Sequence, residues 1–343
     1  MTTHHTKLVR KIQLMGGSTY IVSLPKEWAL QAGIRRGSLV TLSLEPDGTI
    51  KIIPSGKKTR EVSSTTIKVT HDTTRGILIR EIMSRYLAGY KMIKIEFEVD
   101  NYELRRTVRE IITRKLIGAE ILHEDIREVI LQILVNIEEL PINVIVKRMT
   151  NVASNMLKDG IYGLSNINEI DKDTFKDIVE RDDLVDKLYL YGLRQLHATI
   201  KGYLNIEEAG LHRLEEVLPY GVVLKSIERV ADHAAYIAYN CIEMFEPLRS
   251  VKDVKGITDF ANTIIKFFED SINTFLEKDK LNAHKLMDSI PIATREREKK
   301  LAQQLPRLSA KTAIPLRLIL SSYRRISDYS ADILEATLDL AAE

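Results

Sequence analysis

The spacing of apolar residues changes twice along the chain, and each change marks a different kind of structure. Up to about residue 54, short alternating runs typical of strands surround one short helical segment, Pro25–Ala32. Between residues 65 and 136, strand-like and helix-like segments alternate, which predicts an α+β connector domain. From Pro141 onwards the apolar residues recur almost everywhere at helical spacing. The pattern therefore predicts a multidomain α+β protein in which most residues are helical.

Four strands and the short helix are predicted in the first domain, residues 1–56. Pro25 suits the first turn of the helix, with Ser23 near its cap, and Gly33 suits its C-terminal end. Asp47-Gly48 is typical of a hairpin turn between the last two strands. The predicted strands are Arg10–Leu14, Tyr20–Leu24, Leu39–Leu44 and Thr49–Ile53. So few residues make a thin core, and a unit of this size usually needs a partner.

The connector domain, residues 65–136, follows a polar segment, residues 57–64, which is predicted to be a linker. Its apolar spacing predicts four strands and two helices. The strands are expected at 65–70, 92–99, 119–123 and 128–134, and the helices at 74–87 and 102–116. Nothing in it resembles a catalytic constellation, so its predicted role is to set the geometry between the domains on either side.

Six longer helices are predicted in the rest of the chain, in two sets of three separated by a break at Pro247. Their expected ranges are 141–160, 171–204, 214–245, 253–279, 281–304 and 311–341. The segment that begins at Glu228 recurs loosely from Arg324, about 95–100 residues later. This internal repeat predicts two tandem three-helix bundles, residues 141–247 and 252–343.

Charge separates the first domain from the rest. Residues 1–60 contain ten Lys and Arg against three acids, a net charge of +7, whereas the whole chain carries +2. The remaining residues therefore sum to about −5. A basic segment gains affinity for a polyanion by releasing its counterions. The basic head is thus a candidate DNA-binding module, and the acidic body is a candidate sensor.

Composition and missing motifs narrow the class of protein. The chain has 44% hydrophobic residues and 29% charged ones, no run of about 18 apolar residues and no signal-like start, so a cytoplasmic protein without membrane insertion is expected. The single cysteine, Cys241, excludes an intrachain disulfide and is expected in the core. The sequence lacks a glycine-rich phosphate loop, a G-x-S-x-G elbow and an HExxH motif, so no enzyme is predicted.

Paired carboxylates are the candidate chemistry of the helical region. Asp182 and Asp186 lie four residues apart, on one face of a helix, and Glu228 and Asp232 repeat this spacing on the next helix. Like charges at this spacing destabilise a helix unless a cation lies between them. Two facing pairs would offer oxygen ligands to a hard cation.

Neighbouring side chains leave two interpretations of these carboxylates open. His197 and His233 would add nitrogen ligands for a transition metal. Alternatively, the acids form a solvated face that is paired with Arg181, Arg194 or Arg229. When spacing is the sole criterion, the second interpretation is favoured, because carboxylate pairs at this spacing are common in helices.

The head resembles the AbrB/SpoVT/MazE swapped-hairpin family over about residues 7–54. The resemblance rests on the Ser-Leu-Pro-Lys-Glu segment at Ser23, the Ala-Gly-Ile-Arg-Arg-Gly segment at Ala32 and the Asp-Gly hairpin. It implies a homodimer in which two chains interleave into one β-barrel that binds DNA. The residues expected to contact DNA are Arg10, Lys11, Gln13, Lys26, Arg35 and Arg36.

The helical body resembles the PhoU family of phosphate-uptake regulators, through the segments ERDDLVDKLYL and IERVADHAAYIA. The family's acidic motifs often hold metal clusters, so the resemblance implies one divalent or iron-type metal site in the first repeat, with the four carboxylates as ligands. The second repeat departs from the pattern. Arg324 stands where a glutamate is expected, and Asp288 is followed four residues later by Ile292. Asp328 is left alone, and an ion pair with Arg324 is expected instead of a second metal site.

The two resemblances together are typical of archaeal PhoU-like proteins. They imply a DNA-binding regulator of phosphate uptake whose partners are promoter DNA, a second copy of the chain, and a phosphate transporter or its ATPase subunit. The alternative is an adaptor that regulates a transporter or kinase by protein contact, with a head that only dimerises. The swapped-hairpin head also occurs in antitoxins, but these usually end in a short disordered tail, whereas about 200 helical residues are predicted here.

Overall fold

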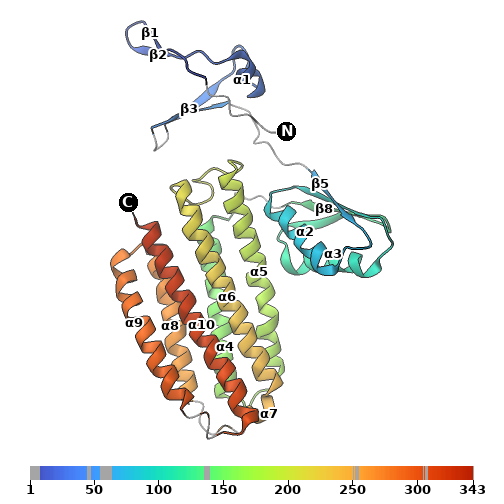
Figure 1. The fold of residues 1–343 in the computed structure, drawn as a ribbon, viewed down its shortest axis with the longest axis vertical. Helices are drawn as coiled ribbons and strands as arrows, with labels where there is room; N and C mark the ends of the chain where they lie inside the picture. The colour runs from blue at the N-terminus through green and yellow to red at the C-terminus, as the bar shows by residue number, and fades with distance from the viewer. Residues whose placement is uncertain are drawn as a thin grey trace. The chain divides into compact units, whose positions relative to one another are not determined.

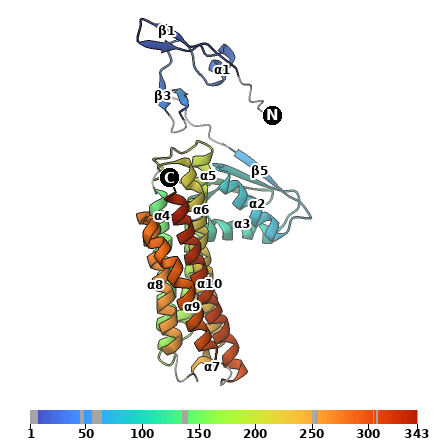
Figure 2. The same cartoon turned by 60° about the vertical axis from the view of Figure 1, so that its left-hand side comes forward.

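The computed structural model describes residues 8–44, 48–54, 64–134, 140–249, 251, 255–303, 305 and 308–342. The predicted Asp47-Gly48 turn and the predicted linker fall largely outside the described residues. Contacts between Cα atoms divide the chain into two units, residues 1–60 and 61–343 (Figures 1 and 2). The first unit is the basic head, and the second joins the connector to the long helices.

The head consists of two separate hairpins and one short helix. Strand β1 (Gln13–Met15) pairs with β2 (Thr19–Ile21), and β3 (Val40–Leu44) pairs with β4 (Ile50–Pro54), both antiparallel. Helix α1 (Lys26–Gln31) lies between the hairpins in the sequence. Two corrections follow: the first strand begins at Gln13, three residues later than expected, and no side chain caps α1, so Ser23 has no capping role.

The described residues of the head form no buried core of their own. Among its described residues none is buried, and apolar side chains on both hairpins are open to solvent. Leu42 is 66% exposed and Ile50 is 68% exposed, although both belong to paired strands. In the described part of one chain, the two hairpins form separate sheets and no closed barrel. Strands with apolar side chains on an open face need a covering surface to be stable.

The connector is a four-stranded sheet covered by two helices on one face. Its elements are β5 (Ser64–Val69), α2 (Arg75–Leu87), β6 (Met92–Phe97), α3 (Tyr102–Lys115), β7 (Ala119–Glu124) and β8 (Glu128–Ile133). The strand order is β5-β6-β8-β7, with β5 and β6 parallel and the other pairs antiparallel. Alternate residues of β6, such as Ile93 and Ile95, are fully buried under the helices. The predicted order of strands and helices is therefore present.

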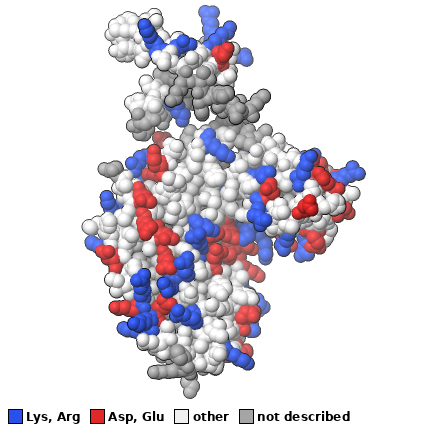
Figure 3. All heavy atoms as spheres, viewed as in Figure 1, with Lys and Arg blue, Asp and Glu red and all other residues white. Residues whose placement is uncertain are grey.

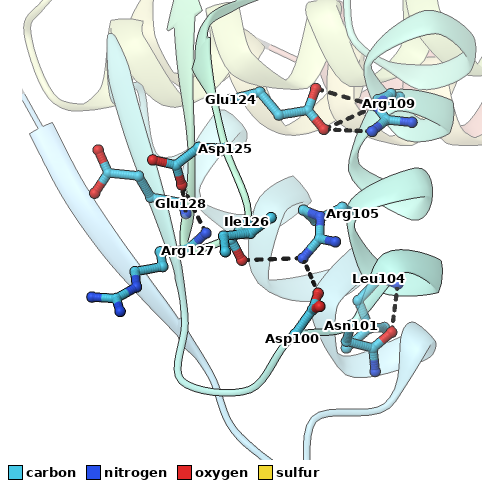
Figure 4. Close-up of polar contacts among 10 residues, drawn as sticks. All are labelled: Asp100, Asn101, Leu104, Arg105, Arg109, Glu124, Asp125, Ile126, Arg127 and Glu128. Atoms are coloured by element: carbon cyan, nitrogen blue, oxygen red, sulfur yellow. Dashed lines mark hydrogen bonds and ion pairs between the residues drawn. The ribbon is translucent and has the colours of Figure 1, made fainter.

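Side-chain bonds fix the ends of the connector helices and its last turn. Thr74 caps α2 by accepting from the amide of Ile77, and Asn101 caps α3 in the same way. In the β7–β8 turn, Asp125 Oδ1 accepts from the amides of Arg127 and Glu128, at 2.7 and 2.8 Å (Figure 4). The same view shows Arg105 and Arg109 of α3 tying that helix to the strand ends.

In the described part of the chain, six long helices pack around a hydrophobic core that runs from Ile142 to Leu340, although the fifth of them buries Ala283 and Ile290 in a separate small cluster. They are α4 (Ile142–Ser165), α5 (Asp173–Ile200), α6 (Val217–Glu243), α8 (Lys255–Glu277), α9 (Lys280–Ala302) and α10 (Ala310–Leu340). Helix α6 packs against α4, α5 and α10, so the two predicted sets of three helices are joined through it. Cys241 is buried in this core. A short helix α7 (Phe245–Arg249) occupies the predicted break, and α4 runs five residues past its expected end.

The length and hydropathy of the helices show whether any of them could span a membrane. None of those in the described part of the chain combines the length and apolar character that crossing a bilayer requires.

Candidate functional site

The six head residues expected to contact DNA are all exposed. Gln13 opens β1 and Lys26 opens α1, whereas Arg10 and Lys11 precede the first strand instead of lying on it. The remaining two, Arg35 and Arg36, lie in the loop after α1. A space-filling view shows basic side chains on the head with little acidic surface between them (Figure 3).

The loop after α1 is held in shape by its own residues. The amide of Arg35 donates to Ser38 Oγ at 2.9 Å, and the amide of Ser38 donates to the carbonyl of Arg35 at 3.0 Å. Gly33 and Gly37 adopt φ values of +76° and +82°, which glycine tolerates better than other residues. The loop thus presents Arg35 from an ordered turn.

The four carboxylates of the first helical repeat come together where α5 packs against α6. The pKa of Asp182 is raised to about 7, mainly by burial and to a smaller extent by the negative charges of Asp186 and Asp232. The pKa of Asp232 is raised to about 6, mainly by burial and to a smaller extent by the negative charges of Glu228 and Asp186. The contributions from neighbouring charges indicate that the other acids lie close by. The structure therefore assembles the acidic set that the sequence pointed to.

Two lysines supply the positive charge at this acidic set. Lys115, from the end of α3, bonds the carboxylate of Asp186 and lies 3.4 Å from that of Asp183. Lys225, one turn before Glu228, contacts both oxygens of that side chain at 2.6 Å. Burial would lower the pKa of Lys115, but its bonds with Asp186 and Asp183 raise it overall. A residue of the connector thus pairs with an acid of the bundle.

The arginines that were expected to pair with these acids have other roles, so that expectation was wrong. Arg181 pairs with Asp159 at 2.7 Å. Arg229 places its guanidinium 5.5 Å from the centre of the Tyr329 ring. Arg194 bonds backbone carbonyls of the connector. Sequence spacing identified the acids but not the cations that neutralise them.

The residues present do not fit a metal ion in this arrangement. No group of three or more His, Cys, Asp or Glu side chains among the described residues is placed to hold one. His197 is exposed, and the His233 ring faces Tyr329 with their centres 5.7 Å apart. Lys115 and Lys225 already neutralise two of the four acids. The metal site in the first repeat stays a prediction that this geometry does not support.

In the second repeat, the expected ion pair between Arg324 and Asp328 does not form. Arg324 lies 3.7 Å from Glu298 of α9, and Asp328 pairs with Arg325 at 3.1 Å. Glu298 is only 7% exposed and also faces Arg317 at 3.4 Å. Sequence reasoning missed Glu298 because it lies in a run of charged residues that indicates only a solvated helix face.

The connector is fastened to the bundle by Arg194, a residue of α5 that is 2% exposed. Its guanidinium donates to the carbonyl of Tyr86, to that of Gly89 at 3.2 Å and to that of Tyr90 at 3.1 Å. The same group lies 4.8 Å from the centre of the Tyr86 ring. The C-terminal end of α2 carries unpaired carbonyls and partial negative charge. Arg194 therefore caps a helix of the connector from within the bundle.

The raised carboxyl pKa values predict a pH dependence. Asp182 and Asp232 bind protons more tightly when folded than when unfolded, so their charge makes the fold less stable as pH rises from about 4 to about 7. Asp182→Asn, which mimics the protonated acid, is expected to raise the free energy of unfolding by more at pH 8 than at pH 5, because at pH 5 the folded chain still holds the proton that the unfolded chain has lost. Urea unfolding in EDTA at both pH values measures this. Equal effects at the two pH values would contradict the assignment.

Comparisons with known proteins agree with this division of the chain. Residues 146–241 match the family model for the PhoU domain, and residues 13–60 match that for the bacterial antitoxin MazE, described as antidote-toxin recognition. The chain is 24% identical over 199 residues to a protein of Thermotoga maritima named phosphate-specific transport system accessory protein PhoU homolog 1, covering 56% of this chain and 82% of that one.

A solved structure is also similar. The crystal structure of PhoU from Pseudomonas aeruginosa matches with a TM-score of 0.49 and 15% identity, over 57% of this chain and 93% of that one. The relatives align with part of the chain, and the head has its own family match. The chain thus carries a PhoU domain behind an N-terminal MazE/AbrB-like domain, and the relatives that it matches are PhoU proteins.

Proposed function

We propose that this protein is a DNA-binding regulator of phosphate uptake, in which a PhoU-like body acts on a basic head. The single observation that carries the proposal is the presence of a PhoU domain and a MazE-like head on one chain. The Thermotoga relative is named as an accessory protein of a phosphate-specific transport system, which supports phosphate as the subject of regulation. A phosphate transporter or its ATPase subunit is the partner that this name suggests for the body.

The head supports a role in binding DNA through its charge and its missing core. Exposed Lys and Arg side chains can contact backbone phosphates, which fixes a protein on DNA without reading its sequence. Open apolar faces on both hairpins favour pairing of two heads, and a pair would present two basic surfaces to one duplex. Promoter DNA and a second copy of the chain are therefore the proposed partners.

The second candidate function is an adaptor that acts by protein contact alone. The same open apolar faces favour it, because a head that only dimerises also needs them. The two functions differ in their response to salt. DNA binding through phosphates weakens steeply as salt increases, with a slope of about one per phosphate contact in a double-logarithmic plot.

The test is binding of the full chain to its own promoter DNA across a salt series. Arg10→Ala/Lys11→Ala is expected to weaken binding at least about tenfold at moderate salt and to reduce the salt slope by about two, because two phosphate contacts are lost. Fluorescence anisotropy of labelled DNA measures both quantities.

A matched control removes the same charge from the body. Lys280 and Lys285 are exposed residues of α9, and Lys280→Ala/Lys285→Ala is expected to leave the salt slope unchanged. If both double variants weaken binding equally, the head is not the DNA-contacting surface. If the wild-type chain does not bind even at low salt, the adaptor function is favoured.

A further inference from the structure

A pocket of about 410 Å³ lies where α2 and α3 of the connector meet α5 and α6 of the bundle. This volume falls within the usual range for small-molecule sites, which often form between domains. Its apolar lining comes from both sides: Ile79, Met83 and Ile111 from the connector, and Leu190 from α5. A molecule bound here would touch both parts of the second unit.

The charged residues of the pocket are sorted by depth. Two acids lie on the inner wall: the side chain of Asp186 is 17% exposed and that of Glu228 is 11% exposed. Two arginines lie at the mouth: the side chain of Arg75 is 67% exposed and that of Arg114 is 65% exposed. Figure 3 shows acidic and basic side chains gathered side by side where the connector meets the bundle. Buried charges act more strongly than solvated ones, so the inner wall favours a cation.

The acids behind the wall strengthen this preference. Asp182 and Asp232 have raised pKa values because of burial and because the charges of the neighbouring acids reinforce each other. Lys115 and Lys225 lie near these four acids, and the raised pKa values indicate that the two lysines do not neutralise all of the acids' charge.

The protein's own side chains show which cation the wall accepts. Lys115, itself a lining residue, bonds Asp186 with a primary ammonium at the end of an aliphatic chain. Lys225 presents the same group to Glu228 and lies 5.0 Å from the centre of the ring of Tyr189, another lining residue. In both contacts an alkylammonium meets a carboxylate, and that of Lys225 also lies over an aromatic ring.

We propose that this pocket binds a small aliphatic amine, of which a linear diamine is the simplest form. One ammonium takes the place of Lys115 at Asp186, beside Glu228, and the methylene chain lies on the apolar lining. The second ammonium reaches the mouth, where it competes with Arg75 and Arg106 for the carboxylate of Glu110. The proposal does not depend on whether the head binds DNA.

The test is calorimetric titration of the full chain with 1,5-diaminopentane. Three other probes separate the alternatives: Mg²⁺ has the same charge without an apolar chain, 1-pentanol has the chain without charge, and pentanoate has the opposite charge. Saturable binding of the diamine, with weaker or no binding of all three, is expected. A preference for Mg²⁺ or for pentanoate would overturn the proposal, as would no saturable binding of the diamine.

Three variants place the binding in this pocket. Asp186→Asn removes the inner charge, and Met83→Trp fills the apolar part, so each is expected to weaken diamine binding about tenfold or more. Lys115→Met keeps the shape of the side chain but removes the competing ammonium, so it is expected to tighten binding.

The direction of the Lys115→Met effect separates binding from damage, because a variant that merely loosened the connector would weaken binding. Asp328→Asn, an exposed acid of α10 that does not line the pocket, is the charge-matched control and is expected to have no effect. Weaker binding in Lys115→Met, or equal losses in Asp186→Asn and Asp328→Asn, would overturn the proposal.

Discussion

Arg194→Met is expected to lower the free energy of unfolding of the second unit by about 3 kcal/mol or more, since hydrogen bonds to a charged group contribute about 1.5–3 kcal/mol each and do not add fully. Methionine fills much of the same space but donates no hydrogen bond. The carbonyls of Gly89 and Tyr90, just past the end of α2, would then lose this donor in a partly buried position, and the carbonyl of Tyr86 would keep the amide of Gly89. Urea unfolding followed by circular dichroism measures the loss.

The controls for this prediction lie on the same helix. Arg181→Met removes an arginine of α5 whose ion pairs are partly solvated, and its expected cost is below about 1 kcal/mol. Hydrogen exchange at residues 86–90 should speed up in Arg194→Met and not in Arg181→Met, because Arg194 bonds the carbonyls at the end of α2 and Arg181 does not. A loss in Arg194→Met no larger than in Arg181→Met would contradict the capping role.

Leu42→Asp is expected to weaken association of two heads at least about a hundredfold, because pairing would bury a carboxylate without a partner. Leu42 is 66% exposed in a single chain, so the same change should cost that chain little. Trp28, the single tryptophan of the sequence, lies in the head and is 42% exposed. The fluorescence emission of Trp28 is measured on serial dilution, together with sedimentation velocity. Because Trp28 lies in the head, its emission reports on the head even if the body also self-associates.

Thr41→Asp is the matched control for this prediction. Successive side chains of a strand point to opposite faces, so a charge at Thr41 lies on the face that Leu42 does not use. Dilution curves should then coincide for Thr41→Asp and wild type and differ for Leu42→Asp. Identical curves for all three proteins would show that the face of Leu42 stays open in solution.

Much of the fold followed from local pattern. Pro141 precedes α4 as its cap, Gly33 ends the head helix with a positive φ, and the alternation in β6 matches its buried residues. These features depend on neighbours in sequence, which single-chain reasoning can see. The resemblance implies a barrel closed by strands from two chains, and the described part of one chain does not form a closed barrel.

The candidate site was predictable only in part, and sequence distance explains the difference. Asp182 and Asp186 share a helix face by spacing, so their proximity could be inferred. Lys115 pairs with Asp186 across 71 positions and from a different domain. Arg194 reaches Gly89 across 105 positions, and no local pattern distinguishes it from a surface arginine. Contacts of this kind are set by how the connector packs on the bundle, which periodicity does not specify.

The exposed apolar faces of the head have a consequence for gene dosage. If a working head needs two chains, then at concentrations well below the dissociation constant of the pair the number of working heads rises with the square of the chain concentration. Halving expression would leave about a quarter of them. If the head binds DNA as proposed, occupancy of its site would therefore respond more steeply to the amount of this protein than that of a monomeric DNA-binding protein would.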